Sequence, residues 1–257
     1  MTEYEIRHQD GVVEFRFNRV ESRNSLTFEM YQALEQVCLD VKQHSDQVVL
    51  ITANGTKAFA SGTDISNFRQ FKDANDAIQY EATIARVIDN IRSCASPVIA
   101  SLHGIVAGGG AAIAAAADIR LATPDTRFGI PIARTLGNCL SVGNLERLVD
   151  LFGESRVRYM LLTGEFLPIE TLVQSGFVSE LLADAEACDL RAWALARHMK
   201  TLAPLTLSAT REGLNRLSRR HPLPADRDLI ERCYLSADFA EGIEAFFAKR
   251  PASWTGQ

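Results

Sequence analysis

The 257-residue sequence has few cysteines and no C-x-x-C pair or Cys/His cluster with the spacing of a zinc site. We therefore expect no bound metal. Its five cysteines are widely dispersed, which favours a reducing compartment over a framework of disulfides. The polar start, MTEYEIRHQD, also lacks the basic and apolar regions of a signal peptide. These features together predict a cytoplasmic protein.

Basic clusters and long apolar runs are missing as well. The net charge is −5, and no basic face is evident that would suit the phosphates of a nucleic acid. The most apolar stretch, Ile105–Ala117, is followed by Asp118 and Arg120 before it reaches the length of a membrane span. The sequence thus predicts a soluble globular protein with neither a nucleic-acid nor a membrane partner.

Hydrophobic periodicity predicts an α/β fold in the first part of the chain. Asp10-Gly11 is flanked by alternating apolar and polar residues, as in a β-hairpin with a tight turn. Short apolar runs then alternate with stretches of helical spacing, an order typical of parallel strands joined by crossover helices. The expected strands are Tyr4–Ile6, Val12–Phe17, Val48–Thr52, Pro97–Leu102 and Ile119–Ala122. The expected helices are Phe28–Lys42, Ala74–Cys94 and Gly108–Ala117, the second with Ile78, Ile84, Val87, Ile88 and Ile91 on one face.

After about residue 140 the pattern becomes mostly helical. The expected helices are Leu145–Leu151, Arg156–Leu162, Glu186–Leu202 and most of Pro204–Arg250. We therefore divide the chain into an α/β core, residues 1–200, which would hold a ligand pocket, and a helical C-terminal region, residues 201–257.

Two loops carry the residues with the clearest chemical meaning. One is Phe59–Ile65, and the other is His103–Gly110, which ends in three consecutive glycines before a helix. Glycines at the start of a helix let a ligand approach the backbone, where unpaired N–H groups and the helix dipole favour negative charge. Taken alone, the three glycines are more typical of a tight strand-to-helix turn than of a ligand site, and they do not match the G-x-G-x-x-G dinucleotide spacing.

Motifs around these loops extend along nearly the whole chain. They are Asn18-Arg19, Asn24-Ser25-Leu26, Ala58–Ile65, Pro97–Gly110, Asp118-Ile119-Arg120, Phe128-Gly129-x-Pro131, Leu162-Thr163-Gly164, Gly176-Phe177-Val178, Asp238-x-x-Glu241-Gly242-x-x-Ala245-Phe246 and Lys249-Arg250-Pro251. With them the sequence resembles the enoyl-CoA hydratase/isomerase (crotonase) superfamily. The resemblance implies a spiral of ββα units with a helical C-terminal trimerisation region, assembled as a homotrimer or a dimer of trimers.

The resemblance also implies an acyl-CoA ligand and an oxyanion hole, with CoA as part of the substrate and no separate cofactor. In this family, one residue of each loop donates its backbone N–H to the thioester oxygen, and the matching positions here are Thr63 and Gly109. Such donors stabilise an enolate or a tetrahedral intermediate. The same likeness places CoA-binding positions at Ala60, Ile65 and Gly108.

The sequence departs from the family pattern where hydratases carry two catalytic glutamates. These positions hold Ala112 and Ile132, neither of which can exchange a proton. The predicted function is an acyl-CoA-processing enzyme, a lyase or isomerase, that stabilises the enolate of a thioester. Its reaction could be hydration, double-bond migration, decarboxylation or C–C hydrolysis, each of which would pass through an enolate-like species. The alternative is a non-catalytic acyl-CoA-binding protein of the same fold, whereas the glycine spacing argues against a nucleotide-binding protein.

Three polar residues follow the Phe-Gly-x-Pro motif, where other branches of the superfamily place active-site groups. Arg134 could pair with a carboxylate or phosphate of the substrate, or lie at the surface or an interface. Asn138 could orient a water molecule or occupy a turn, and Ser141 is a further candidate.

Three charged residues are candidates for contact with CoA. Asp64 could bond to the adenine end of CoA or cap a helix that starts near Ser66. Arg23 and Lys249 could bind the CoA phosphates, Lys249 from a neighbouring subunit, or both could be ordinary surface charges.

Overall fold

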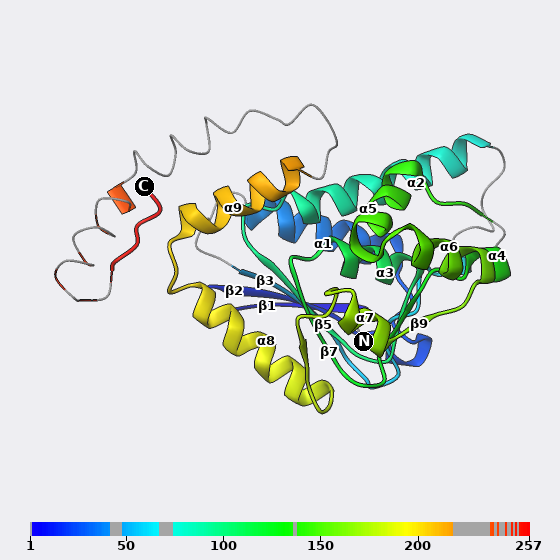
Figure 1. Ribbon diagram of the computed structural model, residues 1–257, viewed down its shortest axis with the longest axis horizontal. Helices are drawn as coiled ribbons and strands as arrows, with labels where there is room; N and C mark the ends of the chain where they lie inside the picture. The colour runs from blue at the N-terminus through cyan, green and yellow to red at the C-terminus, as the bar shows by residue number, and fades with distance from the viewer. Residues whose placement is uncertain are drawn as a thin grey trace.

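The computed structural model describes residues 2–41, 48–66, 74–135, 138–217, 237, 238, 241, 245, 248, 250 and 252–257. Strands and helices alternate through most of this chain (Figure 1). The strands are β1 (Tyr4–Gln9), β2 (Val12–Phe17), β3 (Val48–Ala53), β4 (Ala58–Ala60), β5 (Val98–Leu102), β6 (Ile105–Ala107), β7 (Ile119–Ala122), β8 (Arg127–Gly129), β9 (Leu167–Pro168) and β10 (Glu180–Leu181). The helices are α1 (Phe28–Asp40), α2 (Ala74–Arg92), α3 (Gly108–Ala116), α4 (Ile132–Thr135), α5 (Val142–Phe152), α6 (Glu154–Thr163), α7 (Ile169–Gln174), α8 (Ala185–Met199) and α9 (Pro204–Leu217), with a 3₁₀ turn η1 at Val20–Ser22.

A six-stranded sheet in the order β1-β2-β3-β5-β7-β10 forms the centre of the fold. β1 and β2 pair antiparallel, and the other neighbours in this sheet pair in parallel. Asp10 and Gly11, at the turn of the hairpin, have φ of 51° and 68°. Two positive φ angles are what a type I′ turn requires. The sequence-based prediction of a hairpin followed by parallel strands is confirmed.

Helices cover both faces of this sheet because alternate residues of each strand point to opposite sides. Val12, Val48 and Leu50 pack in one apolar cluster with residues of α8. Val13 and Val49, their neighbours in the chain, belong to the larger cluster that also contains residues of α1, α2 and α3. In Figure 1, α8 accordingly lies on one side of the sheet and these three helices on the other.

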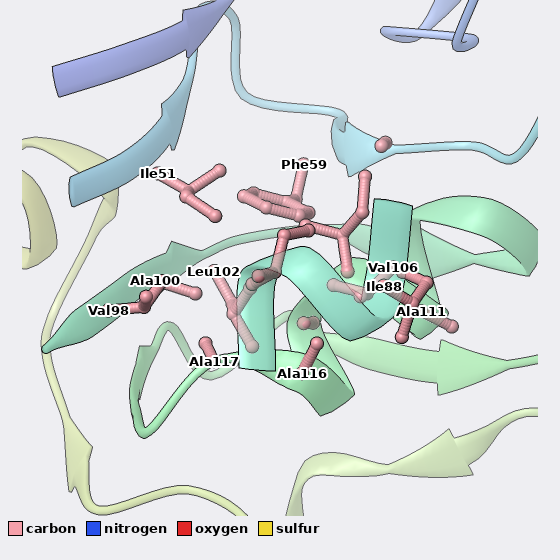
Figure 2. Close-up of a cluster of buried hydrophobic side chains, with 14 of the residues drawn as sticks. Ile51, Phe59, Ile88, Val98, Ala100, Leu102, Val106, Ala111, Ala116 and Ala117 are labelled. Atoms are coloured by element: carbon pink, nitrogen blue, oxygen red, sulfur yellow. The ribbon is translucent and has the colours of Figure 1, made fainter. Parts of the chain in front are cut away.

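A second sheet, in the order β4-β6-β8-β9, stands beside α3. Its short strands and the two-residue strand β10 were not predicted from the sequence, because so few residues show no clear alternation. Figure 2 shows the side chains that join the two sheets, with Ile51 of β3, Phe59 of β4 and Val106 of β6 in the same cluster as Ala111 of α3. The many alanines of α3 therefore pack between the sheets.

One residue of the stripe expected on α2 lies elsewhere. Ile84, Val87, Ile88 and Ile91 are buried as predicted, whereas Ile78 is 64% exposed. The prediction for Ile78 is wrong because, at 3.6 residues per turn, a residue six positions before Ile84 falls on a different face of the helix.

α9 is tied to the end of α2. Arg211 donates from Nη2 to the carbonyl of Ile91 at 3.0 Å and from Nη1 to the carbonyl of Cys94, while its Nε contacts Asp118. Asn215 donates to the carbonyl of Arg92 at 2.6 Å. These bonds satisfy carbonyl groups that the last turn of a helix leaves without internal partners. Helix is described for Pro204–Leu217, and most of the expected helical stretch after it lies outside the described residues.

The side chain of Asn24 fixes the segment between β2 and α1. It is 1% exposed, accepts from the N–H of Arg19 at 2.9 Å, and donates to the carbonyls of Asn54 at 3.0 Å and Ala58 at 2.9 Å. Its φ of 53° is a left-handed conformation that asparagine adopts more readily than most residues. One amide thus joins three separate parts of the backbone.

None of the described helices is long and apolar enough to span a membrane.

We predict that Asn24→Asp lowers the free energy of unfolding by roughly 2–4 kcal/mol, since an oxygen would replace the donor that faces two buried carbonyls. The measurement is urea denaturation followed by circular dichroism. Ser22→Ala, an exposed change in the same segment, is the control and should cost less than about 0.5 kcal/mol. Equal effects of the two substitutions would contradict a structural role for the Asn24 amide.

Candidate active site

The two loops singled out in the sequence meet where α3 begins. Gly62 and Gly108 both have positive φ, 117° and 52°, and a Cβ built on Gly108 would lie 3.2 Å from the Cα of Gly62. A Cβ on Gly110 would lie 2.5 Å from the Cβ of Ala60. Glycine is therefore needed for the first turn of α3 to lie this close to β4 and the loop after it.

Thr63 and Gly109 each present a backbone N–H at this junction. Leu26 donates to the carbonyl of Gly62 at 2.8 Å and accepts from the N–H of Asp64 at 2.9 Å. Because successive N–H groups of an extended chain point to opposite sides, the N–H of Thr63 is directed away from Leu26. Gly109 is the second residue of α3, where the helix itself provides no carbonyl partner.

Both residues line a cavity of about 170 Å³. This volume would hold roughly ten atoms or groups of the size of a water molecule. Its apolar lining consists of Ile65, Ile84, Ala107, Ala112, Ala115, Ile130, Pro131, Ile132, Leu140 and Leu148. Its polar lining, apart from the two loops, consists of Tyr80, Glu81, Thr135, Asn138, Asn144 and Arg147. A mostly apolar hollow with a few polar groups is typical of a site for a small organic ligand.

Ala112 and Ile132, the positions that match the two hydratase glutamates, both lie in this lining. Ala112 is on α3 and Ile132 begins α4, so they come from different elements. Both contribute only hydrocarbon to the cavity.

Three hydroxyl groups meet beside the junction of the loops. The Oγ1 of Thr63 is 2.9 Å from the hydroxyl of Tyr31 and 2.8 Å from that of Tyr80. Burial raises the pKa of both phenols above the ordinary tyrosine value. A raised pKa means that both tyrosines stay protonated near neutral pH, so they act as hydrogen-bonding groups that hold the Thr63 side chain in place.

Glu81 is a residue that the sequence-based prediction missed. It lies on α2, follows Tyr80 and lines the cavity. Burial raises the pKa of its carboxyl group. The signal was present in the sequence, because positions 81, 84, 88 and 91 follow helical spacing and the last three are buried isoleucines. A carboxylate in an apolar stripe is unusual, because charged side chains are seldom buried.

Asn138 and Ile65, among the predicted site residues, also line the cavity, whereas Arg134 and Ser141 do not. Arg134 is exposed and lies 3.6 Å from a carboxylate oxygen of Glu165. Ser141 precedes α5 and its side chain accepts from the N–H of Asn144 at 3.4 Å.

The expected CoA-binding positions differ in burial and in whether they line the cavity. Gly108 lines the cavity, and Ala60 is fully buried against Gly110. Arg23 is exposed, with its carbonyl bonded to the N–H of Ser61 at 3.1 Å. Lys249 lies outside the described residues.

Asp64 has two partners in the structure. Its Oδ1 accepts from the N–H of Ser66 at 3.1 Å, as a capping residue would, and its Oδ2 accepts from Arg19 at 3.0 Å. The bonds from Ser66, with a smaller effect from Arg19, lower the pKa of this carboxyl group. In the part of the chain that the structure describes, no group of three His, Cys, Asp or Glu residues is placed to hold a metal ion.

The sequence from residue 7 to residue 257 matches the family model described as enoyl-CoA hydratase/isomerase. The chain belongs to this family. It is 29% identical to a probable enoyl-CoA hydratase, echA6, of Mycobacterium leprae, with 98% of each chain covered. It is 28% identical to the 1,2-epoxyphenylacetyl-CoA isomerase of Escherichia coli, with 100% of each covered. Among solved structures, an enoyl-CoA hydratase/carnithine racemase from Magnetospirillum magneticum superposes with a TM-score of 0.91 at 28% identity, covering 100% of this chain and 97% of that one. The predicted crotonase fold is confirmed.

We predict that Gly109→Ala destabilises the protein by about 1–3 kcal/mol, because the new Cβ would lie 1.7 Å from the Tyr31 hydroxyl. The cost should be smaller in a Tyr31→Phe background, which removes that oxygen and leaves the nearest remaining ring carbon at 3.0 Å. Urea denaturation of the four proteins of this double-mutant cycle measures the difference. Gly143→Ala is the matched control, since Gly143 is also the second residue of a helix and has nothing within 4 Å of the added carbon. An identical cost of Gly109→Ala in both backgrounds would show that Tyr31 does not limit this position.

Proposed function

We propose that this chain binds an acyl-CoA thioester and stabilises the enolate of that thioester with the backbone N–H groups of Thr63 and Gly109. The observation that carries the proposal is the meeting of the two loops at one largely apolar cavity. Membership of the enoyl-CoA hydratase/isomerase family supports it, as do relatives of similar length that are named for a hydratase and for an acyl-CoA isomerase.

The chemistry follows from where negative charge develops. Removing a proton from the carbon beside the thioester, or releasing a carboxylate on that carbon as carbon dioxide, leaves an electron pair that spreads onto the thioester oxygen. Two N–H donors, one in the first turn of α3, stabilise the charged oxygen more than the neutral carbonyl oxygen. A donor of this kind is typically worth roughly 3 kcal/mol of the activation free energy.

Ala112 and Ile132 limit the choice of reaction. Ordinary hydration of a double bond needs groups that deliver a proton and activate water, and these two side chains provide neither. We therefore place the activity among the other reactions that pass through an enolate, namely double-bond migration, decarboxylation or C–C hydrolysis. The first and third of these would take their proton-transfer group from elsewhere in the cavity. The same two side chains favour the second candidate, a non-catalytic acyl-CoA-binding protein.

The wider features of the proposal come from the family resemblance. Arg23, Asp64, Ile65, Gly108 and Lys249 are the proposed contacts for CoA. Residues 201–257 would form the contacts of a homotrimer or a dimer of trimers, next to an acyl-CoA-binding core of residues 1–200. CoA would enter as part of the substrate, without a separate cofactor. A cytoplasmic location stays a prediction from the sequence.

The test uses acetoacetyl-CoA, whose enolate absorbs in the ultraviolet and can be titrated directly. Binding should lower the pH at which the ligand ionises, because the two N–H groups favour the enolate. In a Tyr31→Phe background, Gly109→Pro removes one N–H, whereas Gly109→Ala adds a Cβ and keeps it. We expect the proline variant to lose about 3 kcal/mol of this stabilisation and the alanine variant to retain it.

A panel of enoyl-CoA and saturated acyl-CoA thioesters then separates the two candidate functions. An enzyme would change at least one of them, as seen from the absorbance of the conjugated thioester or from the exchange of α-protons for deuterium. Binding of acetoacetyl-CoA without a change in its ionisation would overturn the proposed oxyanion hole. Enolate stabilisation without any turnover would favour the binding protein.

A further inference from the structure

We propose that Glu81 is the residue that moves protons to and from the bound acyl group. This inference rests on the proposed function, because it needs a thioester in the cavity. It assigns the proton transfer to α2, whereas the family pattern would place it at positions 112 and 132 on α3 and α4.

The side chains of the cavity wall leave few candidates for this role. Ala112 and Ile132 have no titratable group, and Asn138 and Asn144 carry amides that do not exchange protons near neutral pH. The guanidinium of Arg147 donates hydrogen bonds and has no acceptor with which to take a proton. It already donates to Asp89 at 2.5 Å and to Asn144 at 2.8 Å. Ser61, Thr63 and Thr135 carry only aliphatic hydroxyl groups, so Glu81 and Tyr80 remain among the described residues of the wall.

Tyr80 is poorly suited to be the base. Its hydroxyl is 2.8 Å from the Oγ1 of Thr63, and burial raises its pKa further above neutrality. Glu81 is shifted in the useful direction, because burial brings the pKa of a carboxyl group closer to the pH at which an enzyme works. A carboxylate of this kind can take a proton and give it back.

The placement of Glu81 agrees with this role. Burial is the main cause of the raised pKa of Tyr31 and Tyr80, and the charge of Glu81 adds a smaller increase to each, so the carboxylate interacts with the two hydroxyls that hold Thr63. Tyr31 in turn lies against Gly109, as the 1.7 Å approach of its hydroxyl to a Cβ built there shows. The carboxylate thus lines the same cavity as the residues of both proposed N–H donors.

The groups that face Glu81 come from several elements. Tyr31 of α1 and Tyr80 of α2 interact electrostatically with it. Arg147 of α5 lines the same cavity, while α3 carries only glycine, alanine and isoleucine. Burial is the cause of the raised pKa of Glu81. The carboxyl group is therefore tuned mainly by the apolar cavity.

The proposed step is a proton shift. The Glu81 carboxylate takes a proton from the α-carbon of the thioester, so that the C–H bond breaks and an O–H bond forms on Glu81. The electron pair of the C–H bond forms the enolate, whose oxygen accepts from the N–H groups of Thr63 and Gly109. Return of the proton to the α-carbon gives exchange, and its delivery to the γ-carbon of an enoyl chain moves the double bond. Neither route needs another reactant.

The experiment measures the exchange of α-protons of butyryl-CoA for deuterium in D₂O by mass spectrometry. Glu81→Gln keeps the size of the side chain and removes the base, so we expect exchange to fall by roughly 10²–10⁴-fold. Binding of butyryl-CoA and the downward shift in the ionisation of acetoacetyl-CoA should both persist, because the N–H donors are intact. Glu146→Gln, which removes an exposed carboxylate from α5, is the matched control and should exchange at the wild-type rate.

The pH profile gives a second readout that a structural role would not alter. Wild-type exchange should rise with pH as Glu81 loses its proton, with a midpoint above the ordinary glutamate pKa. Glu81→Asp should retain part of the rate and the same rising form. Glu81→Gln should lose this rise.

The outcomes separate the inference from the proposed function. Wild-type exchange together with an unchanged rate in Glu81→Gln would overturn the role of Glu81 and leave the enolate function intact. A wild-type protein that stabilises the acetoacetyl-CoA enolate and exchanges no α-proton would also overturn it. Absence of both effects in the wild type would overturn the proposed function itself.

Discussion

The close contact between the first turn of α3 and β4 is the constraint on which the site depends. A Cβ at Gly110 would meet Ala60 at 2.5 Å, and Gly62 and Gly108 face each other in conformations that other residues rarely adopt. The close contact of α3 with β4 and the loop after it brings Gly109 next to Thr63. The neighbouring structure reinforces it, because Leu26 pairs with the backbone on both sides of Thr63 and the buried amide of Asn24 bonds to the end of β4.

In the proposed site, the groups that bind negative charge and the group that moves protons belong to different elements. The N–H donors belong to backbone that glycine turns and pairing with Leu26 hold rigidly, so they do not depend on a side-chain rotamer. The group proposed to move protons, Glu81, belongs to α2, and burial raises its pKa. A chain without carboxylates at Ala112 and Ile132 can therefore still place a titratable group at the cavity.

Much of the fold could be predicted from the sequence where patterns are long. The Asp10-Gly11 hairpin, the buried strand β3 and the helix that follows three glycines all produce periodicities of several residues. The three-residue strands β4, β6 and β8 could not be predicted, because they are too short to show alternation. The meeting of the two loops was reached only through the family resemblance. Glu81 was missed because the predicted apolar face of α2 included Ile78 and left out position 81, although position 81 follows the helical spacing of the buried Ile84, Ile88 and Ile91.

The bonds from α9 to the end of α2 have a consequence for the helix that lines the cavity. Arg211 and Asn215 hold the final carbonyl groups of the helix that carries Tyr80 and Glu81 nearer its start. These bonds connect α9 to the cavity through α2, although α9 lines no part of the cavity that the structure describes. A change of sequence in α9 that removed them would therefore leave the carbonyl groups at the end of α2 without these donors, at a distance from the cavity wall itself.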